Sequence, residues 1–265
     1  MKALVTGANK GIGFEIARSL AKKGYEIYVG ARDEVRGEAA TEKLREEGFV
    51  ADFVKIDLND LVASDFAKIS SLDILVNNAG ISGKMATGRS AYDMGKSAFD
   101  YTAEELQETL SVNFLGTHGV ILALLDKLTD EAKILNVTIP ISGNPYWQPL
   151  AYITSKAALN SMTMAFGYQF IKDGSKKQIF GVMPGAVATD LNGMSKIAPE
   201  EIPAQVKTPE KAGALITSFL FDGKNHNAQI INFDGTEITS YEPEMGFAAK
   251  DMDDRQKMLR EISEK

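Results

Sequence analysis

The sequence predicts an α/β protein with a single-domain, doubly wound parallel sheet of about seven strands and helices on both faces. Short apolar segments alternate along the chain with segments of helical periodicity, which is typical of a parallel sheet built from strand–helix–strand units. A glycine-rich turn follows the first apolar segment and leads into a helical pattern. The 265 residues are 44% hydrophobic and 25% charged, a composition that suits a globular domain of this size.

The first expected strand, residues 3–5, leads into the sequence TGANKGIG at residues 6–13. Ile12, Ile16 and Leu20 then recur at helical spacing. A glycine turn at such a junction lets backbone N–H groups approach a pyrophosphate at the helix N-terminus, where the dipole favours an anion. The alternative interpretation is a tight turn with a purely structural role.

The second expected strand, residues 26–30, is followed closely by Arg32. At this distance from the glycines an acidic residue would bind the ribose 2′-hydroxyl of NAD, whereas an arginine accommodates a 2′-phosphate. Lys10 in the glycine turn adds a second positive charge, and Asp33 places one carboxylate beside them. Two cations against one anion favour NADP over NAD. The alternative for Arg32 is a solvated surface charge.

The remaining elements continue the alternation. Thr102 and Glu105 have the spacing of a helix capping box, and Pro209 lies one place inside a helix start, where proline is preferred. Further strands are expected at residues 50–56, 72–76, 133–138, 178–183 and 228–233, and further helices at 34–47, 60–69, 102–128, 151–171 and 208–221.

Two segments between these elements predict loops. Residues 80–101 have low hydrophobicity and several glycines, and we expect them to cover a substrate cleft. Residues 143–150 contain Trp147 and two prolines. This second segment is either a pocket wall for an apolar substrate or a packing surface at the sheet edge or a subunit contact.

Tyr152 and Lys156 lie four residues apart, so both side chains lie on one face of the expected helix. A free tyrosine loses its proton near pH 10. A nearby lysine ammonium favours the phenolate, lowers the tyrosine pKa and makes the phenol a better proton donor. Taken alone, the pair also fits an ordinary half-buried helix.

Four motifs occur together in this chain, namely Thr6-Gly7-x-x-x-Gly11-Ile12-Gly13, Asp57, Asn77-Asn78-Ala79-Gly80 and Tyr152-x-x-x-Lys156. Together they resemble the short-chain dehydrogenase/reductase family, and the resemblance covers roughly residues 2–240. It implies a Rossmann-like domain over residues 1–240 with a mobile substrate lid near residues 190–207, followed by a charged tail at residues 241–265. Residues 9–13 and 30–33 are similar to the NADPH-dependent carbonyl reductases.

The resemblance also implies the cofactor, NADP(H), and roles for individual residues. Tyr152 would be the proton donor, Lys156 would lower its pKa and bind the ribose hydroxyls, and Asn113 would bind a water through a local helix kink. The implied cofactor-binding residues are Gly7, Asn9, Lys10, Gly11, Ile12, Gly13, Arg32, Asp57, Leu58, Asn78, Ala79, Gly80, Tyr152, Lys156, Pro184, Gly185, Val187 and Thr189.

One catalytic position departs from the family pattern. The family places a serine that binds the substrate carbonyl about 13 residues before the tyrosine, where this chain has Ile139. Thr138 stands where the preceding, non-catalytic serine usually stands. Ser142 could reach the site if residues 139–141 form a loop. The hydroxyl is therefore expected from Thr138, from Ser142, or from neither.

Composition excludes several other classes of site and partner. The chain has no cysteine, and its two histidines are far apart in sequence, so no metal is expected. A net charge of −7 and a pI near 5.1 argue against nucleic acid. The N-terminus reads directly as a strand and no apolar run approaches the roughly 20 residues of a membrane span. We therefore expect a cytoplasmic protein without a membrane partner, and the resemblance implies a homodimer or homotetramer.

These features predict NADPH-dependent reduction of an aldehyde or ketone, with Tyr152 as proton donor assisted by Lys156. The substrate is expected to be small and apolar. A non-catalytic NADPH-binding sensor or scaffold is one alternative, which the irregular serine position keeps open. An oxidative dehydrogenase of alcohols or steroids is another, because it would use the same residues.

Overall fold

Seven strands form one sheet in the order β3-β2-β1-β4-β5-β6-β7, and each neighbouring pair is parallel. The strands are β1 (Lys2–Thr6), β2 (Glu26–Ala31), β3 (Ala51–Lys55), β4 (Leu72–Asn77), β5 (Leu128–Val137), β6 (Gln178–Val182) and β7 (Ile230–Ile231). The α-helices are α1 (Gly11–Ala21), α2 (Glu34–Glu46), α3 (Ala103–Leu110), α4 (Thr117–Leu124), α5 (Leu150–Lys172) and α6 (Pro209–Ser218). This computed structural model describes all residues except 83–95, 140–148, 193, 195–200, 202 and 239–265.

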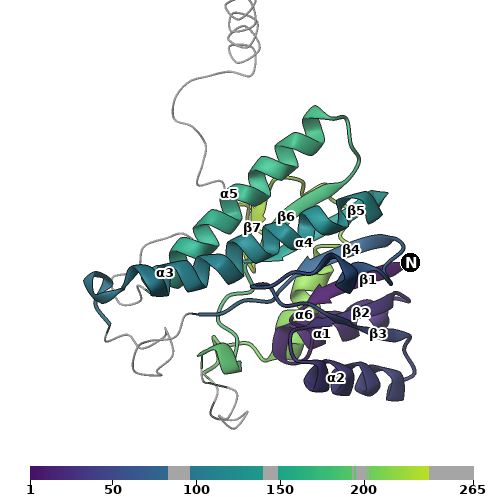
Figure 1. Cartoon of the computed structure of the whole chain (residues 1–265), viewed down its shortest axis with the longest axis horizontal. Helices are drawn as coiled ribbons and strands as arrows, with labels where there is room; N and C mark the ends of the chain where they lie inside the picture. Colours follow the sequence, from purple (N-terminus) through teal and green to yellow (C-terminus); the bar gives the residue numbers. More distant parts are fainter. Residues whose placement is uncertain (83–95, 140–148, 193, 195–200, 202, 239–265) are drawn as a thin grey trace, which may run out of the picture.

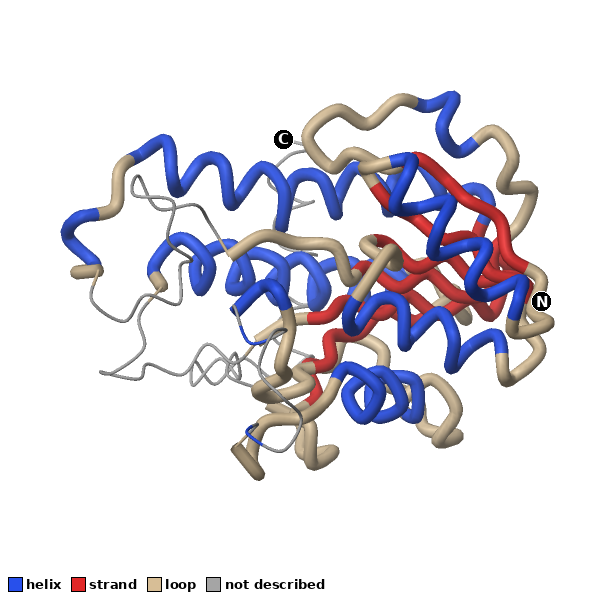
Figure 2. Tube along the Cα trace, turned by 90° about the horizontal axis from the view of Figure 1, so that it is seen from below, coloured by secondary structure: helices blue, strands red, loops and turns tan. Residues whose placement is uncertain are grey.

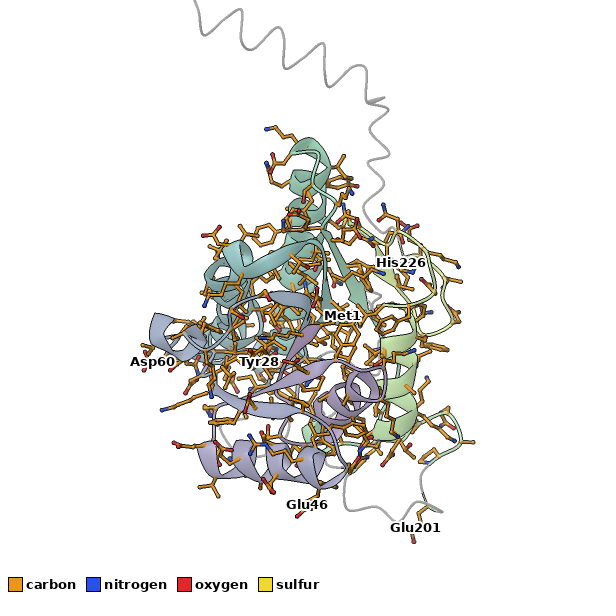
Figure 3. The ribbon with its side chains drawn as sticks, turned by 90° about the vertical axis from the view of Figure 1, so that its right-hand side faces the viewer. Met1, Tyr28, Glu46, Asp60, Glu201 and His226 are labelled. Atoms are coloured by element: carbon orange, nitrogen blue, oxygen red, sulfur yellow. The ribbon has the colours of Figure 1, made fainter. Side chains whose placement is uncertain are left out.

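The sheet is covered by helices on both faces (Figures 1 and 2), which confirms the predicted fold class. Successive side chains of a strand point to opposite faces, so each strand contributes to two cores. On β1, Ala3 and Val5 pack in a core with α1, α2 and α6, whereas Leu4 packs in the other with α4 and α5. Tyr28 is buried in that second core, while Glu46 and Asp60 lie at the periphery (Figure 3).

The helical stretch Ala103–Lys127 begins at the predicted capping box, since Thr102 and Glu105 exchange both side-chain-to-backbone hydrogen bonds. A π-helical turn, Ser111–Gly116, separates α3 from α4, and a 3-10 turn, Leu125–Lys127, ends the stretch. By length and composition alone it could cross a membrane, but 44% of its apolar window is buried inside the protein, and core helices of soluble proteins meet the same criterion.

Three predicted elements differ from the structure. Residues 60–69 contain only a 3-10 turn, Ala63–Phe66, because their backbone closes turns of three residues, as in the bond from the Ile69 N–H to the Phe66 carbonyl (3.1 Å). The Lys127 ammonium also bonds the carbonyls of Phe66 and Ile69 at 2.6 and 2.8 Å. The strand expected at 133–138 begins at Leu128, where it already pairs with Leu72 of β4. The last strand has two residues instead of six, because the chain turns back and Ile238 bonds the carbonyl of Ile230.

Four other predicted segments fall partly or wholly among the undescribed residues. Most of the expected loop at 80–101 and of the segment 143–150 lies there, together with residues 193, 195–200 and 202 of the lid near 190–207. The tail at 241–265 lies entirely outside the described residues.

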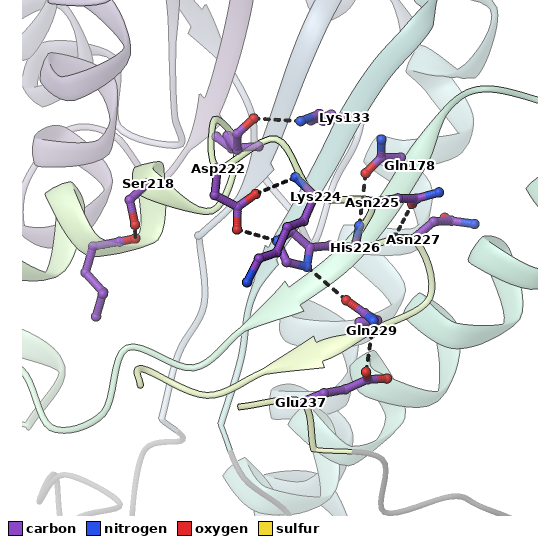
Figure 4. A network of polar contacts seen from close by, with 12 residues as sticks. Lys133, Gln178, Ser218, Asp222, Lys224, Asn225, His226, Asn227, Gln229 and Glu237 are labelled. Carbon is purple, nitrogen blue, oxygen red and sulfur yellow. Dashed lines mark hydrogen bonds and ion pairs between the residues drawn. The ribbon is translucent and has the colours of Figure 1, made fainter. Parts of the chain in front are cut away.

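A buried histidine fastens the segment that precedes β7 (Figure 4). The ring of His226 is bonded at Nε2 to Asp222 Oδ2 (2.8 Å) and at Nδ1 to Gln229 Oε1 (2.9 Å). Gln229 in turn donates to Glu237 at 2.9 Å. Partial burial opposes ionisation of Asp222, but the N–H of Lys224 and the His226 ring hold the pKa of its carboxyl below the usual value. The network lies at the sheet edge, and its residues have no place in the predicted site.

Candidate active site

The glycine turn between β1 and α1 forms a cradle open to an anion. Gly7 and Gly11 have left-handed φ angles of +66° and +57°, a conformation that glycine adopts at little cost. A Cβ placed on Gly13 would lie 2.3 Å from the carbonyl oxygen of Gly7, so only glycine fits there. Lys10 caps α1 without a side-chain hydrogen bond, and the first turn carries no acidic residue. The N–H groups at this helix start therefore suit a phosphate, as the sequence predicts.

The segment after β4 is fastened to this turn by Thr6. The Thr6 hydroxyl accepts hydrogen bonds from the N–H groups of Asn78 (3.0 Å) and Ala79 (3.1 Å). The Asn78 side chain donates to the carbonyls of Thr6 (3.1 Å) and Gly7 (3.4 Å). Thr6 belongs to the predicted motif but was given no role, and its place at the end of β1 is the signal for one.

The positive charge beside the turn comes from more residues than the sequence analysis named. Arg32 is exposed directly after β2. Asp33 caps α2, and hydrogen bonds from the Arg36 side chain (3.0 Å) and N–H (2.9 Å) lower the pKa of its carboxyl. The Asp33 carboxylate, which lies next to Arg32 in sequence, is thus paired with Arg36. Arg36, Lys10 and Lys43 line an open cavity of about 470 Å³ with Asn9, Gly11 and Phe14, and two acidic residues, Glu15 and Glu210, line it as well.

The segment after β6 reaches across to the same turn. Lys10 forms an ion pair with Asp190, although 180 residues separate them in sequence. The Ser82 hydroxyl donates to the carbonyl of Leu191 at 3.4 Å. Residues 190–191 therefore touch both the glycine turn and the segment that follows β4.

Other predicted cofactor residues lie where β3 and β6 end. The Asp57 carboxylate accepts the N–H of Asn59 (3.0 Å), and a Cβ on Gly116 would lie 2.4 Å from the carbonyl of Leu58, so the π-helical turn touches this loop. After β6, Pro184 is buried and Gly185 has a φ of +74°. Val187 in this turn pairs with Lys207 as a parallel bridge. The Thr189 carbonyl accepts the N–H of Met194 at 3.0 Å.

Tyr152 and Lys156 lie on one face of α5 and are 5% and 4% exposed. The Lys156 ammonium lies 5.9 Å from the centre of the Tyr152 ring and donates to the carbonyl of Val137 at 2.8 Å. Burial lowers the pKa of Lys156 to about 8. A Cβ placed on Gly80 would lie 3.7 Å from the lysine nitrogen, so the segment after β4 reaches the α5 face.

Asn113 lies in the π-helical turn, where the resemblance implies a helix kink, and it is fully buried. Its Oδ1 accepts the N–H of Ile81, and its Nδ2 donates to the carbonyl of Ile81, both at 2.8 Å. The second Nδ2 proton goes to the hydroxyl of Ser155 at 2.9 Å. Both amide protons of Asn113 are therefore engaged by the protein.

At the end of β5, the family's serine position holds Ile139, and the one neighbouring hydroxyl among the described residues 137–139, that of Thr138, already donates its proton. The Thr138 hydroxyl donates to Asn160 Oδ1 at 2.6 Å, and Asn160 donates to the carbonyl of Ile139 at 3.3 Å. Ser142 lies outside the described residues. The assignment of a carbonyl-binding hydroxyl to Thr138 or Ser142 stays a prediction.

The sequence and fold of this chain are similar to those of known proteins. Residues 1–199 match the model of the short chain dehydrogenase family. The chain belongs to this family. Carbonyl reductase [NADPH] 1 of Bos taurus is 38% identical over 149 residues, which are 54% of this chain and 50% of that protein. (+)-Neomenthol dehydrogenase of Arabidopsis thaliana is 37% identical over 155 residues, 51% of this chain and 52% of that protein.

The chain spans about half the length of the curated relatives it matches. Among solved structures, a short chain dehydrogenase of Shigella flexneri complexed with NADP superposes with a TM-score of 0.73. It is 21% identical in sequence, and the match covers 88% of this chain and 96% of that one. At this identity the likeness concerns the fold alone.

Proposed function

We propose that this short-chain dehydrogenase is an NADPH-dependent reductase that converts a small, apolar aldehyde or ketone to an alcohol. The observation that carries the proposal is the buried pair Tyr152 and Lys156 on one face of α5. The pair lies beside Gly80, in the segment after β4 that Thr6 fastens to the glycine turn. A proton donor thus lies next to a cradle for a dinucleotide. The likeness to proteins named carbonyl reductase [NADPH] supports the choice of reaction.

The donor set suits NADPH. The N–H groups at the start of α1 would hold the pyrophosphate, and Arg32, Lys10 and Arg36 would hold the 2′-phosphate. Lys156 would bind the ribose hydroxyls. When bound, NADPH supplies a hydride to the carbonyl carbon.

The protein's own contribution is the proton. As negative charge develops on the substrate oxygen, the Tyr152 hydroxyl donates its proton to that atom. The Lys156 ammonium stabilises the phenolate left on Tyr152, and with a pKa of about 8 it keeps most of its charge at neutral pH. A water link from Lys156 to solvent at Asn113 would have to donate to a carbonyl oxygen of Asn113, because both side-chain amide protons are engaged.

A second donor to the substrate oxygen would come from Thr138 or Ser142. Such a donor is worth up to roughly 10²–10³ in rate in other enzymes. Thr138 could serve only by releasing Asn160, to which its single hydroxyl proton is given.

The test is the absorbance of NADPH in the presence of a panel of apolar aldehydes and ketones. Steady cofactor oxidation that depends on the carbonyl supports the reductase. Saturable NADPH binding without turnover of any panel member, or of the matching alcohols with NADP⁺, would support the sensor instead. Turnover of alcohols alone would identify an oxidative dehydrogenase.

We also propose a second copy of this chain as partner. Helices α4 and α5 lie side by side, with the rings of His118 and Phe166 at 5.7 Å. Apolar side chains are exposed along this pair of helices and in the π-helical turn before α4, namely Leu115 in the turn, Leu122 in α4, and Tyr168 and Ile171 in α5. Light scattering after gel filtration should give a dimer or tetramer, and Leu122→Lys should shift it toward monomer.

A further inference from the structure

We propose that Ser155 is a positioning residue that fixes the distance between the cofactor-binding segment after β4 and the catalytic face of α5. The inference rests on the proposed function, since it concerns the same site. Ser155 lies between Tyr152 and Lys156 in sequence and is fully buried. Its role follows from the direction of the hydrogen bonds that it makes.

The hydroxyl of Ser155 has a defined orientation. It donates its single proton to the carbonyl of Tyr152, one turn earlier in α5, at 2.8 Å. Its lone pairs then face Asn113, whose Nδ2 donates to it at 2.9 Å. Ser155 is thus the acceptor for one of the two amide protons of Asn113, and the bond joins α5 to the π-helical turn.

Asn113 carries this connection to the segment after β4. Its amide bonds the N–H and the carbonyl of Ile81 together, both at 2.8 Å, and so fixes two main-chain groups of that residue. Gly80, the neighbour of Ile81, approaches so closely that a Cβ there would lie 2.9 Å from Asn113 Oδ1. Three elements that are far apart in sequence therefore meet through one side chain.

The consequence concerns alignment more than binding. Reaction rates depend steeply on the relative placement of reacting groups, and a displacement of about 1 Å can cost 10²-fold. Without the Ser155 hydroxyl, one buried N–H of Asn113 has no acceptor, and the amide loses one of the three hydrogen bonds that orient it toward Ile81. The segment after β4 then loses its fixed distance from Tyr152, while the glycine turn and its anion cradle stay intact.

Thr163 provides a matched control on the same helix. Its hydroxyl is also fully buried, donates to a carbonyl one turn earlier (Leu159, 2.8 Å) and accepts from an asparagine amide (Asn136, 2.8 Å). Asn136, however, bonds Asn77 inside the sheet and makes no bond to residues 78–81 in the described structure. Thr163→Val therefore removes the same kind of bond without touching the link to the site.

The experiment compares Ser155→Ala with Thr163→Val. For Ser155→Ala we expect kcat to fall about tenfold or more, with the NADPH dissociation constant within about threefold of native. Thr163→Val should lower the melting temperature but keep kcat within about threefold. In an Asn113→Ala background, Ser155→Ala should lower kcat no further, because Ser155 acts through Asn113. A native kcat in Ser155→Ala, or losses that multiply with Asn113→Ala, would overturn the proposal.

Hydrogen exchange tests the same link without turnover, so it separates this inference from the proposed function. The Ile81 amide donates to Asn113 Oδ1, and its exchange should accelerate in Ser155→Ala while staying native in Thr163→Val. This result is expected even if no carbonyl substrate is turned over. Unchanged exchange at Ile81 in Ser155→Ala would refute the positioning role.

Discussion

On the glycine side of the site (residues 6–13, 32–36 and 78–80), the main chain forms most of the contacts that shape the proposed cofactor site. Glycine conformations and backbone N–H groups shape the cradle, and Thr6 fastens it. On the α5 side (Asn113, Val137, Tyr152, Ser155 and Lys156) buried side chains hold one another across elements. Substitutions on the two sides should therefore have different effects: those on the glycine side should weaken cofactor binding, and those on the α5 side should lower turnover.

Tyr152→Phe should give the largest effect and the cleanest separation of the two sides. Removing the proton donor should lower kcat by roughly 10²–10⁴-fold, because general acid catalysis contributes about that much. The NADPH dissociation constant should stay within a few-fold, since the cradle is untouched. Steady-state kinetics with fluorescence titration of NADPH check both. Full activity in this variant would remove the α5 side from the mechanism.

Gly13→Ala should disrupt the glycine turn and weaken NADPH binding. The new Cβ would meet the Gly7 carbonyl at 2.3 Å and the Asn78 amide at 2.5 Å, so the turn has to move. We expect NADPH affinity to fall by about tenfold to a hundredfold, as overpacking costs about 1–3 kcal/mol. Gly24→Ala is the control for the loss of a glycine without a clash: Gly24 has no neighbour within 4 Å of its Cβ position, although its φ of +87° is positive and that of Gly13 is not. Equal losses of affinity in both variants would contradict a specific cradle.

Arg32→Asp should sharpen the assignment of the glycine side to NADPH. Removing a cation and adding an anion beside the proposed 2′-phosphate site should weaken NADPH by roughly 10- to 100-fold. NADH should change only a few-fold, since it lacks that phosphate. Arg45→Asp, which removes another α2-region arginine that pairs with Glu42 and Asp52, controls for net charge. Equal losses for NADPH and NADH would defeat the cofactor assignment.

The buried ammonium of Lys156 should make the free energy of unfolding depend on pH. Its pKa is lowered to about 8 in the folded protein, so between pH 8 and about 10.4 the unfolded chain binds more protons than the native one. Native stability should therefore rise with pH in that window, by up to ~1.4 kcal/mol per pH unit. In Lys156→Met this rise should be absent. Urea unfolding at pH 7, 8, 9 and 10 checks it, and parallel curves for both proteins would exclude the shift.

Asp222→Asn should give the smallest effect, because it lies far from either side in the sheet-edge network. The asparagine keeps an acceptor for His226 but loses the charge, and we expect a loss below about 1 kcal/mol near neutral pH. The lowered pKa of Asp222 means that its contribution is present above its unfolded pKa and lost as pH falls through the folded value. Native and variant stabilities should thus converge as the pH falls below the unfolded pKa of about 3.9, and kcat should not change. A large loss of kcat would mean that the network supports the site.

The sequence was informative where the structure depends on near neighbours. The glycine turn, the capping box at Thr102 and the Tyr152–Lys156 spacing are local, and so is the Asp33–Arg36 pair, which went unrecognised although its spacing was visible. Residues 60–69 were mispredicted as a helix: their backbone closes three-residue turns, and Lys127, far along the chain, bonds the carbonyls of Phe66 and Ile69, which local periodicity does not show.

The links that complete the site could not be read in the same way. Asn113 meets Ile81 across 32 residues and Ser155 across 42, and nothing in their sequence neighbourhoods marks them as partners. Such contacts follow from the parallel sheet, which brings the carboxyl ends of its strands to one edge. The fold therefore had to be known before these hydrogen bonds could be foreseen.

The ion pair between Lys10 and Asp190 has a thermodynamic consequence for cofactor exchange. If Lys10 also serves the phosphates of NADPH, its ammonium has two competing anionic partners, one in the ligand and one in the segment after β6. Each partner then weakens the other, and linkage makes the two effects equal in free energy. Strengthening the contact at Asp190 would lower NADPH affinity by the same factor by which NADPH loosens that contact. The exposed position of the pair makes this coupling sensitive to ionic strength, so salt becomes a means of setting how readily the cofactor leaves.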